Sequence, residues 1–406
     1  TRDEILSMLA KEMLDAAEQL PASQPEVGRI HKYIALAYAA KIKLYQAYQQ
    51  DEITHAVTSI NKELLREVVS LCDQVTASNR YGLLDDFQGL DLVTNENGKE
   101  SVFAIQYSMN DGTESAGRIN WSNLLNSPGG GSPYGGDGFF LPSQDLINAY
   151  QTDANGLPDF NYQSKSDYSW AVLNNGVYTL QNTTPNVDPR LDFVVGRPTI
   201  TWKTYPDKPC EGWVRDKDTY GYNCAKRFWV SPESSDMFNG WPWGASQLNW
   251  QIIRYADILL WKAEALIELN EGNGLETARD LINQIRNRAR NSAYVKDFND
   301  HSKYAANYLV NPYPADVWNQ DYARQALRWE TRLEKALEGE RFFDLVRWGI
   351  VETTMNKYIA AESDNRIYYA NAHFTGGKDE YYPVPNNQYG FSGGKYVQNP
   401  GYAPFN

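Results

Sequence analysis

The sequence is poor in positive charge. Its 38 Lys and Arg residues face 51 Asp and Glu residues, which gives the 406-residue chain a net charge of −13 at neutral pH. Proteins that bind nucleic acid need a basic surface opposite the phosphates, so we expect no nucleic-acid partner. No run approaches 18 consecutive apolar residues, and the sequence therefore predicts no helix that spans a membrane.

Cysteine and histidine are also scarce, with three and four residues. Cys72, Cys210 and Cys224 lack the Cys-x-x-Cys spacing of a zinc site, and the histidines are scattered along the chain. The glycines at 129–131 are not followed by the Lys-Ser/Thr of a phosphate-binding loop, and no Gly-x-Ser-x-Gly marks a nucleophilic serine. We therefore predict no metal site, no cofactor and no catalytic residue.

Aromatic residues are abundant instead. They make up 13% of the chain, with 12 Trp and 28 Tyr, and most of the tryptophans lie between residues 81 and 250. Gly, Pro, Asn and Asp interrupt that stretch every few residues, which predicts loops with short strands at 102–107 and 197–205. Rings in such a region either fill a core or present flat faces to a ligand, and the composition leaves both interpretations open.

Helical periodicity dominates the rest of the chain. Apolar residues recur at 3.6-residue spacing and predict helices over 1–20, 29–49, 53–77, 250–270, 275–290 and 322–337. The stretch richest in aromatic and charged residues is 340–349, ERFFDLVRWG. Phe342, Leu345 and Val346 share one face there, and the charges alternate in sign every three residues from Glu338 to Arg347. This pattern predicts a short helix packed between others.

Stacked helix pairs of this size predict a mainly α fold, a tetratricopeptide-like helix-pair scaffold with a large loop-rich insert that contains short β-strands. We expect a single domain over 1–406. Its predicted parts are repeat helices at 1–80, an irregular ligand-binding region at 81–249, repeat helices at 250–358, and a C-terminal tail packed on the scaffold at 359–406. The chain opens inside a predicted helix without Met, so we expect an N-terminal segment to be missing.

Several motifs in register carry a resemblance to a known family. They are DPRLD at 188–192, RYADILL at 254–260 with AEAL at 263–266, LINQIRNRA at 281–289, RLE at 332–334 with LEGERFFDLVRWG at 337–349, and YPVP at 382–385 with QNPGY at 398–402. In order and spacing they resemble the SusD/RagB family, the starch-utilisation-system-D-like outer-membrane nutrient-binding lipoproteins of Bacteroidetes.

The resemblance implies a SusD-like fold and a non-catalytic cell-surface protein for carbohydrate and nutrient uptake. Such a protein captures an oligosaccharide or polysaccharide and delivers this glycan to a SusC-like TonB-dependent outer-membrane transporter. The implied localisation is the extracellular face of the outer membrane, through a lipid anchor in the missing N-terminal segment.

Two alternatives stay open beside this interpretation. A minority of the family binds peptides. An all-helical glycoside hydrolase or lyase would also line a groove with Trp and Tyr, although the sequence singles out no carboxylate pair in residues 81–250.

Candidate glycan-binding residues come from the aromatics in turn-rich sequence, because no family motif fixes the ligand contacts. An indole can cover the apolar face of a sugar ring, and polar side chains can bind its hydroxyls. The strongest candidate is the turn NGWPWG at 239–244, and core packing is the alternative for every residue. The full predicted set is Trp121, Tyr134, Tyr168, Trp170, Trp213, Tyr220, Trp241 and Trp243.

The implied export also bears on the cysteines. An exported protein meets an oxidising environment, so we predict a disulfide between Cys210 and Cys224, with two free thiols as the alternative. A loop of this length would gain about 3 kcal/mol of stability from the crosslink. Cys72 falls beside an apolar helical stripe, where we expect a buried hydrophobic side chain.

Overall fold

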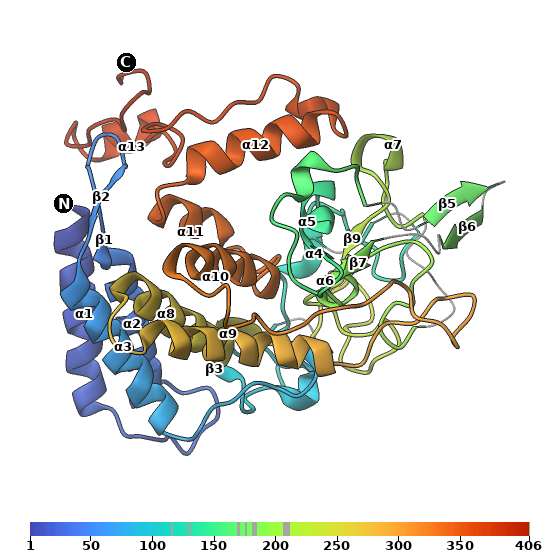
Figure 1. Ribbon diagram of the computed structural model, residues 1–406, viewed down its shortest axis with the longest axis horizontal. Helices are drawn as coiled ribbons and strands as arrows, with labels where there is room; N and C mark the ends of the chain where they lie inside the picture. Colours follow the sequence, from blue (N-terminus) through green and yellow to red (C-terminus); the bar gives the residue numbers. More distant parts are fainter. Residues whose placement is uncertain are drawn as a thin grey trace.

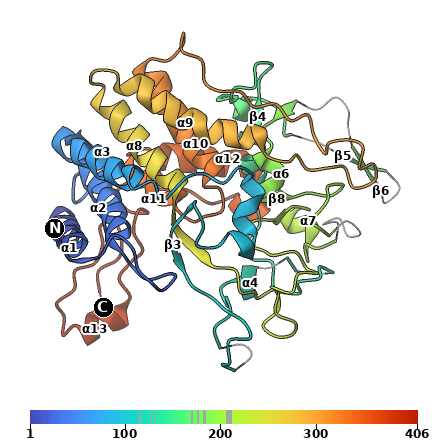
Figure 2. The ribbon, with the colours of Figure 1, turned by 90° about the horizontal axis from the view of Figure 1, so that it is seen from below.

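The computed structural model describes residues 1–114, 117–126, 128–129, 131–168, 171–174, 177–180, 185–205 and 212–405. Helices from the two ends of the sequence lie together at one side of the molecule, and the insert lies at the other (Figure 1, Figure 2). The scaffold helices are α1 (Arg2–Gln19), α2 (Lys32–Ala47), α3 (Lys62–Ala77), α8 (Tyr255–Leu269), α9 (Gly274–Asn291), α10 (Gln320–Glu334), α11 (Arg341–Arg347) and α12 (Val351–Ser363).

The scaffold helices pack in sequence as antiparallel pairs. α1 contacts α2, α2 contacts α3, α3 contacts α8, and α8 contacts both α9 and α10. Small residues on α2, among them Ala37, Ala39 and Ala40, are fully buried, which lets neighbouring backbones approach closely. The apolar side chains of α8 fill the middle of the same core. This arrangement confirms the mainly helical, tetratricopeptide-like scaffold predicted from the repeats.

The helix starts follow their capping residues. Thr1 and Glu4 form the capping box at the start of α1. Asn61 caps α3 by accepting from the backbone N–H groups of Glu63 and Leu64. The prediction of one helix over 53–77 was therefore wrong in its first third, because Val57 lies on strand β2 (Val57–Ile60), which pairs with β1 (Tyr48–Gln50) as a hairpin.

The insert consists of loops and short elements. Its two-stranded sheets pair β3 (Ser101–Ile105) with β10 (Trp250–Arg254), β4 (Gln151–Thr152) with β7 (Asn186–Val187), β5 (Ala171–Asn174) with β6 (Val177–Leu180), and β8 (Val195–Gly196) with β9 (Cys224–Ala225). The strand predicted at 102–107 is confirmed as β3. The strand predicted at 197–205 was wrong, since Ile200 and Trp202 there form only isolated bridges.

Short helices complete the insert: α4 (Asn123–Asn126), α5 (Gln144–Ala149), α6 (Arg190–Val194), α7 (Lys217–Tyr220), and the 3-10 turns η1 (Phe87–Asp91), η2 (Val93–Asn95) and η3 (Tyr162–Ser164). Much of the aromatic content of this region is buried. One cluster packs Trp202, Trp213 and Trp229 around Tyr134 and Cys224. The insert therefore has a core of its own, separate from the helical core.

A buried network of ion pairs joins the insert to the scaffold. Its central carboxylate is Glu334 of α10, which lies 3.0 Å from Arg254, 2.5 Å from Arg288 and 3.2 Å from Arg190. Arg190 comes from the insert and also pairs with Asp188 at 2.7 Å. The DPRLD motif thus fixes the insert against α10. All of these side chains are almost fully buried, so the pairs depend on one another for their charge balance.

Helix α11 is fixed in a similar way. Arg347 forms an ion pair with Asp344 at 2.8 Å and a second one with Glu264 of α8. The indole N–H of Trp348 also donates to Glu264, at 2.9 Å. These contacts confirm that α11 is a packed structural helix. Gly349, at a φ of 67°, ends it.

The C-terminal part of the chain returns to the scaffold. The predicted tail begins too early, because α12 continues to Ser363, and a 3-10 turn η4 (Ile367–Tyr369) and α13 (Asn386–Phe391) follow. Tyr381 packs against His55, with ring centroids 4.6 Å apart. This contact brings the tail onto the β1–β2 hairpin at the end of the molecule that holds both termini (Figure 1).

Candidate functional site

Three of the predicted tryptophans lie exposed on neighbouring loops of the insert. Trp241, Trp243 and Trp121 are 60%, 50% and 42% exposed. The rings of Trp121 and Trp241 meet edge to face, with centroids 5.2 Å apart and an interplanar angle of 80°. We call Trp121, Trp241 and Trp243 the tryptophan surface. Large rings that stay this exposed are candidates for ligand contact.

The backbone of two loops brings these rings together. The N–H of Phe238 donates to the carbonyl of Ala245 at 2.8 Å and closes the turn whose tip is Trp241-Pro242-Trp243. The N–H of Asn120 donates to the carbonyl of Ser246 at 2.9 Å and places Trp121 at the base of this turn. The two loops thus present their indoles at one place on the surface.

A third loop supports Trp243. A Cβ added to Gly135 would lie 3.0 Å from the Cβ of Trp243, and Gly135 has a φ of 70°, so this close contact requires glycine. At the next residue, the guanidinium of Arg215 donates to the carbonyl of Gly136 at 2.7 Å and pairs with Asp137 at 3.0 Å. Exposed hydrogen-bonding groups therefore stand beside the indoles.

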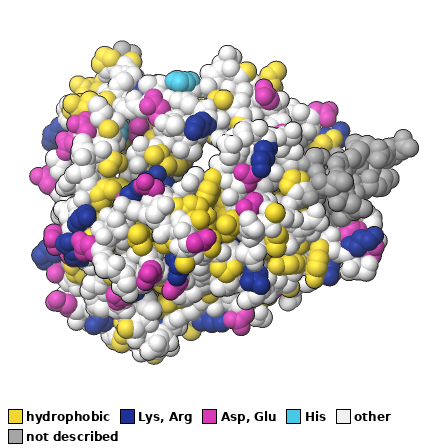
Figure 3. All heavy atoms as spheres, in the orientation of Figure 1, with side chains coloured by type: hydrophobic (Ala, Val, Ile, Leu, Met, Phe, Trp, Pro, Cys, Tyr) yellow, Lys and Arg dark blue, Asp and Glu magenta, His cyan; other side chains and the backbone are white. Residues whose placement is uncertain are grey.

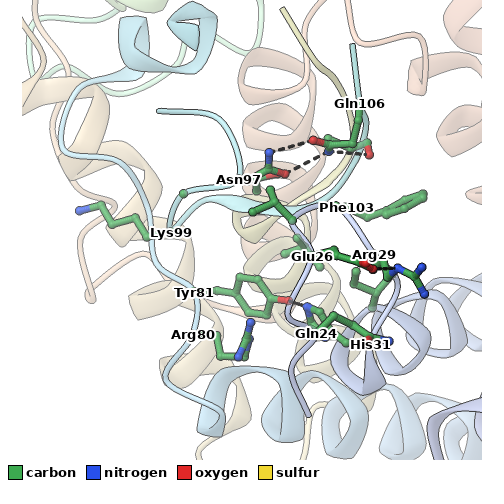
Figure 4. A pocket seen from close by; sticks show the side chains of 17 residues that line it. Gln24, Glu26, Arg29, His31, Arg80, Tyr81, Asn97, Lys99, Phe103 and Gln106 are labelled. Atoms are coloured by element: carbon green, nitrogen blue, oxygen red, sulfur yellow. Dashed lines mark hydrogen bonds and ion pairs between the residues drawn. The ribbon is translucent and has the colours of Figure 1, made fainter. Parts of the chain in front are cut away.

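Two further cavities lie outside the tryptophan surface. One of about 500 Å³ opens between the segment after α1 and strand β3 (Figure 4). Its polar groups bind one another: Asn97 and Gln106 exchange hydrogen bonds of 2.9 and 3.0 Å, and Tyr81 hydrogen-bonds His31 at 3.2 Å. Burial, then the charge of Arg80, lowers the pKa of His31. This cavity offers a sugar few free partners.

A larger cavity of about 890 Å³ lies between the segment that contains η1 and η2 and residues 226–236. Lys203 and Asp91 in its wall form an ion pair of 3.0 Å. Asp236, also in its wall, accepts from the Gln247 side chain at 2.6 Å. Asp236 and Gln247 flank the turn that carries Trp241, so the cavity borders the base of the tryptophan surface.

The comparisons with known proteins agree with this fold. The model of the SusD family matches residues 99–402. The chain belongs to the SusD family. No curated protein matches the sequence.

Solved structures of SusD-like proteins superpose on most of the chain. A SusD homologue from Bacteroides thetaiotaomicron has a TM-score of 0.65 at 17% identity, and the superposition covers 98% of this chain and 70% of the homologue's chain. A laminarin-binding SusD-like protein has a TM-score of 0.52 at 20% identity, covering 98% and 69%. Surface glycan-binding protein A from Bacteroides thetaiotaomicron has a TM-score of 0.54 at 17% identity, covering 98% and 70%.

At these identities the likeness shows a SusD-like fold. The chain spans only 61% of a SusD-like protein from Bacteroides fragilis and 64% of a SusD superfamily protein from Bacteroides vulgatus.

Not all predicted site residues reach the surface of this SusD-family protein. Trp213, Tyr134 and Tyr168 are buried, so their prediction as sugar platforms was wrong. Tyr134 donates its O–H to the carbonyl of Val230 at 2.6 Å and accepts from the indole N–H of Trp202 at 2.7 Å. These rings build the aromatic core of the insert. Trp170 lies outside the described residues.

Trp213 is buried in the aromatic core of the insert, whereas Tyr220 is exposed. Its ring contacts Tyr368 after α12, with centroids 5.9 Å apart, and Tyr368 in turn contacts Tyr369 at 4.6 Å. The tyrosines after α12 were not predicted as candidates, although two adjacent tyrosines after an amphipathic helix are a visible signal. Tyr220 therefore belongs to a second aromatic cluster.

Another exposed ring was missed in the loop that follows Gly135. Phe139 is 73% exposed, and its N–H donates to the carbonyl of Leu125, which is exposed too, at 3.0 Å. The signal was present in the sequence, as two Phe residues follow directly on Gly138 in a glycine-rich loop. The loop from Trp121 to Phe139 thus presents several apolar side chains to solvent.

The structure does not show the predicted disulfide at Cys224, because Cys224 is a buried free thiol. Its Sγ lies 3.8 Å from the carbonyl oxygen of Gly196, inside the aromatic cluster of the insert. Cys210 lies outside the described residues. Cys72 is fully buried among apolar side chains, and burial raises the pKa of its thiol to about 12.

Several acidic residues of the insert are engaged by local donors. Asp111 accepts from Ser108 and Thr113, and these hydrogen bonds lower its pKa. Asp216 caps α7 through Thr219, which lowers its pKa as well. A general acid of a glycosidase needs a raised pKa, so neither carboxylate fits that role.

Glu96 differs from these. Burial raises its pKa to about 7; the backbone N–H of Asn249 opposes this shift, and the charge of Asp236 adds to it. Among the described residues, no group of three His, Cys, Asp or Glu side chains is placed to hold a metal ion. None of the helices in the described part of the chain is long and apolar enough to cross a membrane.

Proposed function

We propose that this protein is a non-catalytic cell-surface glycan-binding protein and that the tryptophan surface holds an oligosaccharide or polysaccharide. The observation that carries the proposal is the set of three exposed indoles on adjoining loops of a SusD-family chain. Each indole offers a flat apolar face. The charged side chains of Arg215 and Asp137 beside them supply partners for sugar hydroxyls.

The expected affinity is modest. A fully buried Trp hides about 150–250 Å², which at about 25 cal/mol per Å² corresponds to roughly 4–6 kcal/mol. These rings are already half buried, so a sugar can cover only part of that area. Association also costs several kcal/mol. Two or three stacked sugars would therefore bind weakly to moderately, which suits a protein that passes its ligand on.

The proposed partner is a SusC-like TonB-dependent outer-membrane transporter, which receives the glycan. We further propose that the protein acts at the extracellular face of the outer membrane through a lipid anchor. Membership of the SusD family supports both proposals. Two solved structures of the same fold bear names that state laminarin binding and surface glycan binding, and these names support a glycan as the ligand class.

One observation favours a second candidate function, that of a hydrolase. The raised pKa of Glu96, with Asp236 close enough to add to it, is the pattern of a carboxylic acid that stays protonated near neutral pH. Neither residue belongs to the tryptophan surface. A peptide-binding role, known within the family, is the remaining alternative.

A glycan panel tests the proposal. The protein is run through native gels that contain, in turn, neutral and acidic polysaccharides, and the same mixtures are assayed for new reducing ends. Retardation by one or more glycans without new reducing ends supports a binding protein. New reducing ends that disappear in Glu96→Gln would establish the hydrolase. Retention by an oligopeptide library together with no glycan retardation would establish the peptide binder.

A further inference from the structure

A hollow between α10, α11 and α12 carries an excess of positive charge. Figure 3 shows this face of the molecule hollowed beside α12. One part of the hollow has a volume of about 340 Å³. Among the described residues it is lined by one carboxylate, Asp321, and by a set of basic side chains. We call this part the basic hollow. Its basic residues are Arg324, Arg328, Arg332, Arg341 and Lys357. The whole chain, in contrast, carries a net charge of −13.

Two of these basic groups are already neutralised. Arg324 pairs with Glu268 at 2.7 Å and with Asp321 at 3.0 Å. Arg332 pairs with Asp145 at 2.6 Å. Asp321, the only acidic residue in the described part of the lining, is therefore already engaged.

The other three basic groups have no carboxylate partner within the described part of the chain. Arg328 and Arg341 lie over the ring of Trp348, 5.3 and 5.8 Å from its centroid. One N–H of Arg341 donates to the backbone carbonyl of Arg328 at 3.4 Å. Lys357 of α12 is exposed at the rim of the same hollow.

Elsewhere this protein pairs its buried guanidiniums closely. Arg190, Arg254, Arg286 and Arg288 each meet at least one carboxylate within 3.1 Å. The pKa of Arg341 falls to about 9, first through burial and then through repulsion by Arg332. Arg341 is partly buried. A guanidinium that is partly removed from water without a counter-charge is less well stabilised than a paired one, and a bound anion would offset that cost.

The sequence had indicated a different role for Arg341. The charges that alternate from Glu338 suggested pairs along the helix, but Glu338 turns away and pairs with Arg254 at 2.7 Å. Asp344 pairs with Arg347 at 2.8 Å. Arg341 is thus left facing the hollow. The most characteristic motif of the chain therefore contains one guanidinium that no carboxylate of the described residues pairs.

The rest of the lining suits a sugar. Phe160 and Trp329 provide apolar ring surface, and Gln325, Thr353 and Thr354 provide amide and hydroxyl groups. The volume of about 340 Å³ is at the lower end for small-ligand pockets, so the ligand would have one or two rings. Guanidiniums bind carboxylates through short charge-assisted hydrogen bonds.

We infer that the basic hollow is a second binding site, distinct from the tryptophan surface, for a saccharide unit that carries a carboxylate, such as a uronic acid. The carboxylate lies between Arg328, Arg341 and Lys357. This inference rests on the proposed function in one respect, that the ligand is a saccharide. The site would give the protein selectivity for acidic over neutral glycans.

Calorimetry with digalacturonate tests the inference, with the neutral galactose disaccharide and acetate as comparison ligands. Digalacturonate is expected to bind at least about tenfold more tightly than either comparison ligand. Its affinity is expected to fall as sodium chloride is raised from about 50 to 300 mM. Equal binding of the neutral disaccharide, equal binding of acetate, or no binding of digalacturonate at millimolar concentration would each overturn the inference.

Two variants locate the site, and a third serves as a control. Arg341→Gln is expected to weaken digalacturonate binding about tenfold or more, and the exposed Lys357→Gln about threefold to tenfold. Lys395→Gln removes an exposed lysine of the tail and is expected to change nothing. Lys357→Gln perturbs no buried contact, so unchanged binding in this variant would contradict the assignment even if Arg341→Gln folds poorly.

The two proposals fail independently. The double variant Trp241→Ala, Trp243→Ala is expected to lose neutral-glycan binding and to keep digalacturonate binding. If neutral glycans bind and digalacturonate does not, the basic hollow is refuted and the proposed function stands. If digalacturonate binds and this binding depends on Lys357, but no glycan longer than a disaccharide binds, the tryptophan surface is refuted and the basic hollow stands.

Discussion

Neutralising Glu334 is expected to loosen the junction between the insert and the scaffold. In Glu334→Gln, the side chain keeps its size but loses the charge that faces three guanidiniums. Arg254, Arg288 and Arg190 lie at 3.0, 2.5 and 3.2 Å from this carboxylate, and Glu334 itself is fully buried. The variant therefore leaves buried positive charge only partly compensated.

The structure limits the size of the effect. Removing one partner of a buried ion pair costs about 3–5 kcal/mol. Here Arg254 and Arg288 keep Glu100, at 2.7 and 3.1 Å, and Arg190 keeps Asp188, so no guanidinium is left alone. We therefore expect the lower end, a loss of about 3 kcal/mol in the free energy of unfolding.

Urea unfolding followed by tryptophan fluorescence and far-ultraviolet circular dichroism measures this loss. Glu271→Gln is the matched control, because Glu271 pairs with Arg66 at 2.7 Å on the exposed surface. Exposed pairs contribute less than about 1 kcal/mol. If Glu334→Gln is no more destabilised than Glu271→Gln, the buried network does not hold the insert in place.

Further predictions concern pH, the insert core and the end of α11. Burial opposes ionisation of Glu334, but Arg288, Arg254 and Arg190 outweigh it and lower the pKa from 4.5 to about 2. This contribution to stability is complete above about pH 4.5 and is lost as pH falls toward 2. Urea midpoints should drop in that window, and they should drop less steeply in Glu334→Gln, where other carboxylates with a lowered pKa, such as Asp188, still titrate. Tyr134→Phe leaves the indole N–H of Trp202 without its acceptor and should cost about 1–3 kcal/mol by urea unfolding, with glycan retardation unchanged. Gly349→Ala puts an alanine at a φ of 67°, which is strained for a residue with a side chain, and places its Cβ 2.8 Å from Val57. The melting temperature of this variant should fall by several degrees. An unchanged melting temperature would contradict this packing.

The helical scaffold could be predicted because it depends on local patterns. The capping box at Thr1, the stripes of α8 and α9, and the packed helix at 341–347 all follow from periodicity and end signals. Strand β2 within 53–77 was missed, since Val57 and Ile60 fit a helical stripe as well as a strand. Only the cap at Asn61 marks the true start of α3.

The insert resisted prediction because burial there is a property of distant contacts. Trp241 and Trp213 stand in similarly turn-rich sequence, yet one is exposed at the tip of a closed turn and the other packs against Trp202 with ring centroids 4.8 Å apart. No local pattern separates the two cases. The same holds for Arg341, which lacks a carboxylate partner among the described residues because Glu338 and Asp344 pair elsewhere.

The most direct test of the central claim is titration calorimetry of the tryptophan surface with the glycan that retards the protein most. Trp241→Ala, Trp243→Ala is compared with the wild type and with Phe391→Ala, which removes an exposed ring of the tail. We predict that the double variant binds at least about tenfold more weakly and that Phe391→Ala binds as the wild type does. Unchanged affinity in a folded double variant would contradict the claim that these indoles hold the glycan.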